Sequence, residues 1–197
     1  MSFRKERKFR VTAHDSRALK SQLLGLGMVG LHPDRKITSQ YFDTPELRAF
    51  EESEEGVLPR FKIRVRWYND DQNILTLERK ISSIEGRFKT SEVVSSEIFD
   101  RMMQKGRLDE AYGVVFPSVM ISYRRAYFSF GDVRITFDRD IRYIFAPGTM
   151  IFRDFEEVIE VKAPAHTPDD YLEKLVPIPS SRFSKYGRSF LHRGRAI

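Results

Sequence analysis

The sequence predicts an α+β fold in which a mostly antiparallel sheet curls around a charged lumen. Strand-like segments are interspersed with helical ones, and short turn signals join several strands, which is typical of antiparallel sheets. At least five strand-like segments carry charged residues at alternate positions. Because side chains two apart on a strand share a face, each segment would direct its charges to one side of the sheet. The positions in between are apolar and would face a core.

The alternating charges recur along most of the chain. They are Glu6, Lys8 and Arg10; Lys62, Arg64 and Arg66; Glu78 and Lys80; Arg134 and Asp138, with Thr136 between them; and Glu160 and Lys162. One such strand is ordinary, because its charges can simply face water. Several of them, rich in cations but four with a carboxylate, favour an enclosed lumen that holds a polyanion and its metal ion.

In the first half of the chain we expect strands at residues 3–12, 37–43, 60–68 and 73–82. A helix capped by Asp15 or Ser16 would separate the first two strands. A turn or short helix over 44–50 and a solvated acidic loop over 51–55 would follow the second strand. The Asn-Asp-Asp sequence at 69–71 is a hairpin signal between the last two strands.

In the second half we expect strands at residues 118–130, 132–143 and 155–163, and helices at 91–104, 107–113, 168–175 and 182–192. Val94, Ile98 and Met102 repeat at the four-residue spacing of a helix. A Gly-Asp turn would join the first two of these strands. Since no internal repeat or low-complexity linker divides the chain, we expect one domain over residues 1–197.

Composition narrows the compartment and the chemistry. The 197 residues have a formal net charge of +6 and an isoelectric point of about 9.5, which favours anionic partners. There is no cysteine, so disulfides, thiol catalysis and zinc ribbons are excluded. The basic N-terminus leads into no apolar stretch, and no apolar run reaches the roughly 18–20 residues of a membrane-spanning helix. We therefore expect a cytoplasmic protein.

Nine short segments carry a resemblance to a known family. In order they are Glu6-Arg7-Lys8-Phe9, Tyr41-Phe42-Asp43-Thr44, Lys62-Ile63-Arg64-Val65-Arg66, Leu77-Glu78-Arg79-Lys80, Gly86-Arg87-Phe88-Lys89, Tyr123-Arg124-Arg125, Arg134-Ile135-Thr136-Phe137-Asp138, Glu160-Val161-Lys162 and Ser184-Lys185-Tyr186-Gly187. Each segment alone is weak, because short charged peptides are common. Together they resemble the VTC domain of polyphosphate polymerases, within the triphosphate tunnel metalloenzyme superfamily, over nearly the whole chain.

The resemblance implies an antiparallel barrel that forms a tunnel, flanked by helices and closed by the C-terminal helix. It implies transfer of the ATP γ-phosphoryl group to a growing polyphosphate chain, with Mn²⁺ or Mg²⁺. The expected catalytic residues are Lys8, Arg64, Arg66, Lys80, Arg125, Arg134 and Glu160. The expected substrate-binding residues are Arg10, Lys62, Tyr41, Lys89, Lys162, Ser184 and Lys185. Glu160 would be the first metal ligand, and the shared parity of Glu78 and Glu6 with the basic rows makes them supporting candidates.

The first segment departs from the pattern of the wider superfamily. Many of its triphosphatases begin with Glu-x-Glu-x-Lys, whereas the three positions here are Glu6, Lys8 and Arg10. A lysine in the middle removes one potential metal ligand and adds one phosphate contact. This difference favours the polymerase branch over the hydrolase branch.

Two other functions stay open. The same fold could hydrolyse inorganic triphosphate, nucleoside triphosphates or an RNA 5′ end, or it could be a non-catalytic polyphosphate-binding module. We expect no specific nucleic-acid partner, because the aromatic residues lie on the opposite parity from the cations. The expected partners are ATP and polyphosphate. A membrane-protein partner stays open, and the sequence contains nothing that decides the oligomeric state.

Overall fold

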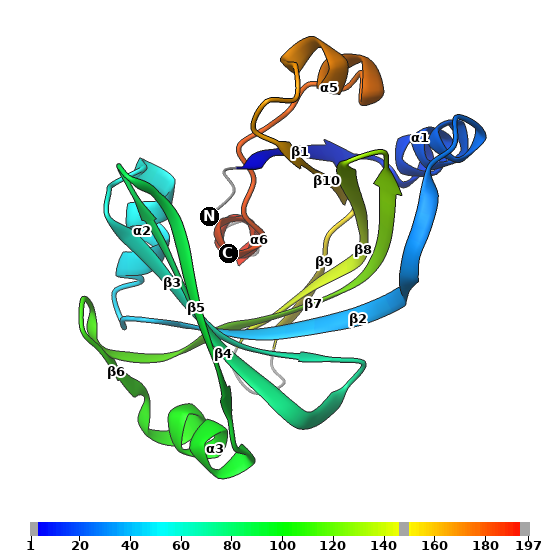
Figure 1. The fold of residues 1–197 in the computed structure, drawn as a ribbon. Helices are drawn as coiled ribbons and strands as arrows, with labels where there is room; N and C mark the ends of the chain where they lie inside the picture. Colours follow the sequence, from blue (N-terminus) through cyan, green and yellow to red (C-terminus); the bar gives the residue numbers. More distant parts are fainter. Residues whose placement is uncertain (1–3, 146–149, 194–197) are drawn as a thin grey trace. The chain divides into compact units, whose positions relative to one another are not determined.

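Strands and helices alternate as the sequence predicts, with several boundaries moved. The computed structural model describes residues 4–145 and 150–193. Its elements are β1 (Arg4–Val11), α1 (Ala13–Gly25), β2 (Val29–Asp43), α2 (Arg48–Glu55), β3 (Arg60–Tyr68), β4 (Asp71–Ser83), β5 (Gly86–Val94), α3 (Ser96–Lys105), β6 (Arg107–Asp109), β7 (Gly113–Phe130), β8 (Val133–Phe145), β9 (Met150–Arg153), β10 (Glu157–Pro164), α5 (Asp169–Leu175) and α6 (Lys185–Arg193) (Figure 1). Within these ranges, no helix combines the length and the apolar character needed to cross a bilayer.

Hydrogen bonds connect the strands in the order β1-β10-β8-β7-β2-β3-β4-β5, with β6 on β7 and β9 on β8. The pairs β1–β10, β10–β8, β2–β3, β3–β4, β4–β5 and β6–β7 are antiparallel. The predicted α+β class with a mostly antiparallel sheet is therefore confirmed.

The chain divides into two compact units. Unit 1 comprises Met1–Arg35, Tyr123–Ile141 and Arg153–Phe183, and unit 2 comprises Lys36–Ser122, Arg142–Phe152 and Ser184–Ile197. Strands β2, β7 and β8 each run from one unit into the other. Neither unit is a continuous stretch of sequence, and the single domain over residues 1–197 stays a prediction.

The core of unit 1 lies between the apolar face of its strands and two helices. Its buried members include Phe9 and Val11 of β1, Ile135 and Phe137 of β8, Ile159 and Val161 of β10, Leu19 and Leu23 of α1, and Leu172 and Leu175 of α5. Figure 1 shows α1 and α5 beside β1 and β10. These strand residues are the apolar positions that the alternation predicts, so the charged positions of the same strands lie on the opposite face.

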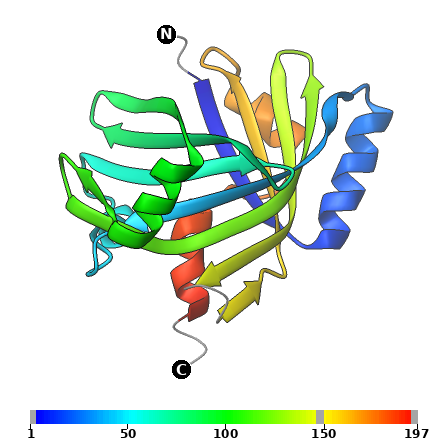
Figure 2. The same ribbon diagram turned by 90° about the horizontal axis from the view of Figure 1, so that it is seen from below.

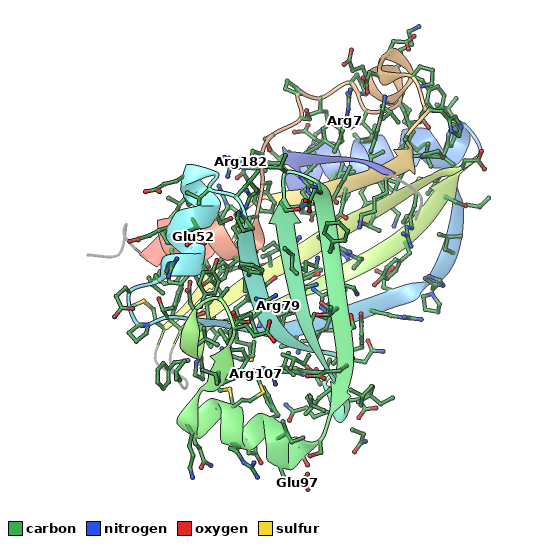
Figure 3. All side chains as sticks on the ribbon, turned by 60° about the vertical axis from the view of Figure 1, so that its left-hand side comes forward. Arg7, Glu52, Arg79, Glu97, Arg107 and Arg182 are labelled. Atoms are coloured by element: carbon green, nitrogen blue, oxygen red, sulfur yellow. The ribbon has the colours of Figure 1, made fainter. Side chains whose placement is uncertain are left out.

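The core of unit 2 is built in the same way on β3 and β4. Ile63, Val65, Trp67, Leu75 and Leu77 pack with Phe99 and Met102 of α3, which Figure 2 shows beside the strands of this unit. Trp67 and Phe99 meet edge to face, with ring centroids 5.7 Å apart. On β4, the Arg79 side chain, labelled in Figure 3, donates a 2.7 Å hydrogen bond to Asp109. Its guanidinium lies 4.0 Å from the centre of the Phe61 ring. The core face of β4 therefore carries one structural ion pair.

The prediction of a solvated loop over residues 51–55 is wrong, because these residues belong to α2. Ser53 is buried, and Glu52 accepts a hydrogen bond of 2.6 Å from the Tyr112 hydroxyl. Asp43 starts the helix, since its carboxylate accepts hydrogen bonds from the backbone amides of Ala49 and Phe50. Tyr112, which is distant in sequence, and Asp43, which precedes the helix, thus stabilise this acidic segment as a helix rather than a loop.

Two helix predictions in the middle of the chain are also wrong in part. Residues 91–94 extend β5, because they pair with β4, and α3 begins only after the Ser95 cap, whose hydroxyl accepts from the Ile98 amide. Residues 107–109 form β6 against β7 rather than a helix. Gly106 has a φ of +73°, and a Cβ there would lie 2.7 Å from the Val115 carbonyl oxygen. This glycine permits the close turn from α3 into β6.

Other boundary differences are small. Thr12, rather than Asp15 or Ser16, caps α1, and its hydroxyl accepts a 3.1 Å hydrogen bond from the Asp15 amide. β2 begins at Val29, eight residues before the predicted start at residue 37. The predicted hairpin at 69–71 is confirmed, because Asn69 and Asp70 both have positive φ and join β3 to β4.

Candidate active site

In unit 1, charged side chains of both signs share one face of the sheet, which we call the mixed face. It comprises Glu6 and Lys8 of β1, Arg125 of β7, Arg134, Thr136 and Asp138 of β8, and Glu160 and Lys162 of β10. Glu160 lies opposite Lys8 on one side and Thr136 on the other. In the next row, Lys162 lies opposite both Glu6 and Arg134. The predicted parity of these three strands is therefore confirmed by their register.

Glu160 is the centre of the mixed face. Lys162 lies 2.9 Å from one carboxylate oxygen, and Arg125 lies 3.3 Å from the other. Burial raises the pKa of Glu160, but the charges of Arg125, Lys162 and Lys8 outweigh it and hold the pKa well below its usual range. Arg125 is itself fixed by Asp138, which accepts two hydrogen bonds of 2.6 and 2.7 Å. Glu160 is therefore ionised at neutral pH, and its carboxylate is fixed in position by Lys162 and Arg125.

A small cavity of about 90 Å³ opens on the mixed face. It is lined by Arg125, Tyr127, Arg134, Thr136, Glu160 and Lys162. Five of these six residues come from the charged rows and the arginine motif found in the sequence. The cavity therefore brings together four predicted site residues of unit 1, Arg125, Arg134, Glu160 and Lys162.

In unit 2, cations predominate on one face of β3, β4 and β5, which we call the cationic face. It comprises Tyr41 of β2, Lys62, Arg64 and Arg66 of β3, Glu78 and Lys80 of β4, and Lys89 of β5. Lys62 lies directly opposite Lys80, and Lys80 lies directly opposite Lys89. Like charges in such positions destabilise a sheet unless an anion compensates them.

Glu78 is the carboxylate of the cationic face, and cations surround it. Arg64 donates to Glu78 at 2.6 Å and Lys89 at 2.8 Å, while Arg66 lies 3.9 Å away. Burial raises the pKa of Glu78, but the charges of Arg64 and Arg66 outweigh it and lower the pKa to about 2. The structure therefore places Glu78 where it holds Arg64 and Lys89 in position.

The pKa values of Tyr41 and Lys80 are both lowered by the excess of positive charge on this face. Burial raises the pKa of Tyr41, but Arg64, Arg66 and Lys80 outweigh it and lower the pKa to about 7. The charge of Arg64, followed by desolvation, lowers the pKa of Lys80 to about 7. Both shifts have the sign expected where cations exceed carboxylates.

The beginning of α6 docks beside the cationic face. Lys62 donates a 2.9 Å hydrogen bond to the Ser184 hydroxyl. The ring of Tyr186 stacks on the ring of Tyr41, with centroids 4.8 Å apart and planes 17° apart. The Tyr186 hydroxyl donates a short hydrogen bond to Asp43. These contacts fix Ser184 and the half-buried Lys185 at this end of β3.

The predicted site residues fall into two groups, one in each unit. Glu6, Lys8, Arg125, Arg134, Glu160 and Lys162 are on the mixed face, and Tyr41, Lys62, Arg64, Arg66, Glu78, Lys80, Lys89, Ser184 and Lys185 are on or beside the cationic face. Arg10 shares the parity of Lys8 but pairs with Glu156 at 2.6 Å. Their roles in catalysis and binding stay predictions.

The structure adds residues to which sequence reasoning gave no such role. Asp138 fixes Arg125, and its place in the row of Arg134 and Thr136 was the signal that could have indicated it. The bond from Tyr186 to Asp43 joins residues 143 positions apart, so no local pattern could have indicated that contact.

The mixed face suits a divalent cation only in company with phosphate. Across residues 4–145 and 150–193, no three Asp, Glu or His side chains gather as a metal site. Mg²⁺ and Mn²⁺ commonly take one or two carboxylates and complete their shell with substrate phosphates and waters. Glu160, with Glu6 on the adjacent strand, can supply that number. Glu78 and Glu160 are alike in that a cation lies against each carboxylate oxygen, and Glu78 has Arg66 as a further cation 3.9 Å away.

The family model of the VTC domain matches residues 3–192. The chain belongs to the VTC domain family. A search of curated proteins gave no significant match. The family confirms the resemblance that the nine charged segments indicate.

Solved structures share the fold of this VTC domain at low sequence identity. A candidate adenylate cyclase from Bacillus halodurans is 15% identical, with a TM-score of 0.61 over 93% of this chain and 94% of the other. A candidate adenylyl cyclase from Hippeastrum, described as having a dominant triphosphatase activity, is 16% identical, with a TM-score of 0.57 over 96% of each chain. A candidate adenylate cyclase from Vibrio parahaemolyticus is 14% identical, with a TM-score of 0.54 over 93% and 95%. The likeness confirms the predicted class of α+β tunnel fold.

Proposed function

We propose that this VTC domain is a metal-dependent polyphosphate polymerase that transfers the γ-phosphoryl group of ATP to a growing polyphosphate chain. The observation that carries the proposal is the row Lys62–Lys80–Lys89, three lysines directly opposite one another on paired strands. Glu78 balances Lys89 and Arg64, but the face as defined holds five cations and one carboxylate, so it suits a ligand whose negative charges repeat. Lys8 also supports a polymerase, because many triphosphatases of the wider superfamily have a glutamate at this middle position of the first strand.

The transfer itself needs positioning and charge stabilisation rather than a side-chain nucleophile. A terminal oxygen of polyphosphate would attack the γ-phosphorus of ATP in line, and the bond between the γ-phosphorus and the bridging oxygen would break to release ADP. Arg64 and Arg66 on the cationic face, and Arg134 on the mixed face, would each neutralise charge on the phosphate oxygens bound at their own face. Glu160 and Glu6 would hold Mn²⁺ or Mg²⁺, which supplies further neutralisation of the phosphate oxygens when bound.

The proposed ligands, cofactor and compartment are those that the sequence led us to expect. ATP and polyphosphate are the proposed ligands, Mn²⁺ or Mg²⁺ is the proposed cofactor, and the cytoplasm is the proposed compartment. The alternative within the same fold is a triphosphatase, in which water replaces the phosphate chain as the nucleophile. A non-catalytic polyphosphate-binding module is the third reading.

The deciding experiment follows three products from one reaction. The purified chain is incubated with ATP and Mn²⁺, and polymer on a gel, ADP and orthophosphate are measured together. The proposal expects one phosphate in polymer for each ADP released. Orthophosphate equal to ADP, without polymer, would support the triphosphatase, and tight polyphosphate binding with neither product would support the binding module.

A matched pair of variants connects that reaction to the lysine row. Lys80→Met removes the central charge of the row, whereas Lys105→Met removes an exposed charge at the end of α3. We expect the first to slow polymer formation and weaken polyphosphate binding, and the second to change neither. Equal behaviour of the two variants would contradict the assignment of the row to the substrate.

A further inference from the structure

Thr136 on β8 carries a buried hydroxyl that no described group satisfies. Its side-chain oxygen has no hydrogen-bond partner among the residues that the structure describes, and the residue is 6% exposed. Buried polar groups without a partner are rare in native proteins and point to an absent water, ion or ligand. The hydroxyl of Thr136 therefore has hydrogen-bonding capacity that the described residues do not use.

The strand itself does not need this hydroxyl. Ile135 and Phe137, on either side of Thr136, are buried in the core on the opposite face of β8. Valine has the same branched shape and the same preference for strands, so packing alone would accept it. The polar atom at this position therefore requires an explanation other than the fold.

The surroundings of Thr136 identify the chemistry of the missing partner. It lines the cavity of the mixed face together with Arg125, Arg134, Glu160 and Lys162. Asp138 balances Arg125 and Glu160 balances Lys162, so Arg134 leaves one positive charge in excess at the cavity, which suits a phosphate group. An ionised phosphate offers only acceptors, so a hydroxyl beside it must be the donor.

The carboxylate in the cavity is already engaged. Glu160 has Lys162 against one oxygen and Arg125 against the other. Arg134 is exposed, and within the described ranges it has no ion pair. An incoming phosphate would therefore meet Arg134 and the hydroxyl of Thr136 from the adjoining positions of one strand face.

We propose that Thr136 contacts substrate directly, its hydroxyl donating a hydrogen bond to an oxygen of a phosphate group bound in this cavity beside Arg134 and Lys162. The choice of a condensed phosphate as ligand rests on the proposed function. The contact itself requires binding only, so it can be measured without turnover.

The test measures binding of inorganic triphosphate by calorimetry in EDTA, for the wild type, Thr136→Val and Thr136→Ser. Loss of one hydrogen bond to a charged ligand should weaken binding by about tenfold or more in Thr136→Val. Thr136→Ser keeps the hydroxyl and should stay close to the wild type. Without ligand, Thr136→Val should unfold at the same temperature as the wild type or higher, because it removes an unsatisfied polar group.

Ser181 supplies the matched control. Its hydroxyl is also buried without a partner in the described part of the chain, but it does not line the cavity. Ser181→Ala should therefore bind triphosphate as the wild type does. Equal losses in Ser181→Ala and Thr136→Val would overturn a specific contact.

Two further results in EDTA would overturn the proposal. They are unchanged affinity in Thr136→Val and absence of triphosphate binding by the wild type. Unchanged affinity with a lower unfolding temperature would identify the partner as a structural water. If the wild type forms no polymer but Thr136→Val still binds triphosphate more weakly, the polymerase proposal fails and this one stands.

Discussion

The mixed face of unit 1 and the cationic face of unit 2 are built from the same alternation but differ in how their charges are balanced. On the mixed face, Glu6 and Glu160 each have a lysine within 3.1 Å, and Arg125 is held by Asp138. On the cationic face, Glu78 is surrounded by Arg64, Arg66 and Lys89, and the next row consists of Lys62, Lys80 and Lys89, which lie opposite one another.

Under the proposed function, the two faces would have different tasks. A face that holds its own carboxylates in place can present oxygen ligands to a metal ion. On a face with surplus cations, the cations repel one another, and a bound polyanion would relieve this repulsion. The same substitution should therefore have different effects in the two units.

The largest effect is expected for Glu160→Gln on the mixed face. Loss of the carboxylate should lower the rate of the proposed phosphoryl transfer by about a thousandfold, because charge at the proposed metal site is lost. Some stability should be lost as well, because Lys162 loses its carboxylate, but the fold should be kept since Arg125 retains both hydrogen bonds to Asp138. Transfer rates over a range of Mn²⁺ concentrations, with thermal unfolding as the control, check this outcome. Near-native rates at every concentration would show that Glu160 does not bind the metal.

The equivalent change on the cationic face, Glu78→Gln, should act mainly on stability. It leaves Arg64 and Lys89 without their carboxylate, and such a loss at a buried pair costs about 3 kcal/mol. Denaturant unfolding measures this cost. Added triphosphate should recover more stability in the variant than in the wild type, because more positive charge awaits the ligand. A variant as stable as the wild type would contradict the role of Glu78 as the holder of these cations.

Acid should weaken the fold through the same carboxylate. The folded pKa of Glu78 is about 2, below its ordinary value of 4.5, so its contribution is complete above pH 4.5 and is lost as the pH falls towards 2. The loss should be on the order of 3 kcal/mol for this group. Unfolding free energies at pH 5 and pH 2.5 should differ less in Glu78→Gln than in the wild type. Identical pH dependence in the two proteins would show that Glu78 does not contribute to the loss of stability in acid.

Arg66→Ala should weaken polyanion binding with little effect on folding. Arg66 donates a 3.0 Å hydrogen bond to Ser39 and lies 3.9 Å from Glu78, so its loss disturbs less than loss of Arg64. Triphosphate affinity should fall by about 2 kcal/mol, or roughly thirtyfold. Arg101→Ala, at an exposed position of α3, is the control and should bind normally. If both variants bind equally well, Arg66 does not contact the ligand.

The smallest effect is expected for Tyr186→Phe. The variant keeps the ring stacked on Tyr41 and loses the hydrogen bond to Asp43 and a longer one of 3.4 Å with Ser118. Because Asp43 still accepts from the amides of Thr44, Ala49 and Phe50, the cost should be about 1 kcal/mol in unfolding free energy. No measurable cost would mean that stacking alone docks α6.

The charged faces were predictable from sequence because strand parity is strictly local. Lys62, Arg64 and Arg66 share a face whatever the rest of the chain does, and the hairpin at 69–71 then sets their partners on β4. The helices were less predictable. Residues 51–55 fold because Tyr112 and Asp43 hold α2, and both contacts come from outside the segment.

The middle of the chain shows a second reason for failure. Val94, Ile98 and Met102 have helical spacing, but Val94 is buried as the last residue of β5, and Met102 is buried in α3. Ile98 is 42% exposed. Periodicity here ran across a boundary between two elements. The docking of Tyr186 on Asp43 depends on tertiary contact alone, so this part of the site needed coordinates.

The lysines at positions 62, 80 and 89 have a practical consequence at the bench. Any buffer anion that settles among them adds stability as RT ln(1 + [L]/Kd), so a melting temperature taken in phosphate or sulfate reports on the buffer as well as on the polypeptide. Meaningful comparisons of variants require chloride of fixed concentration and protein stripped of co-purified phosphates.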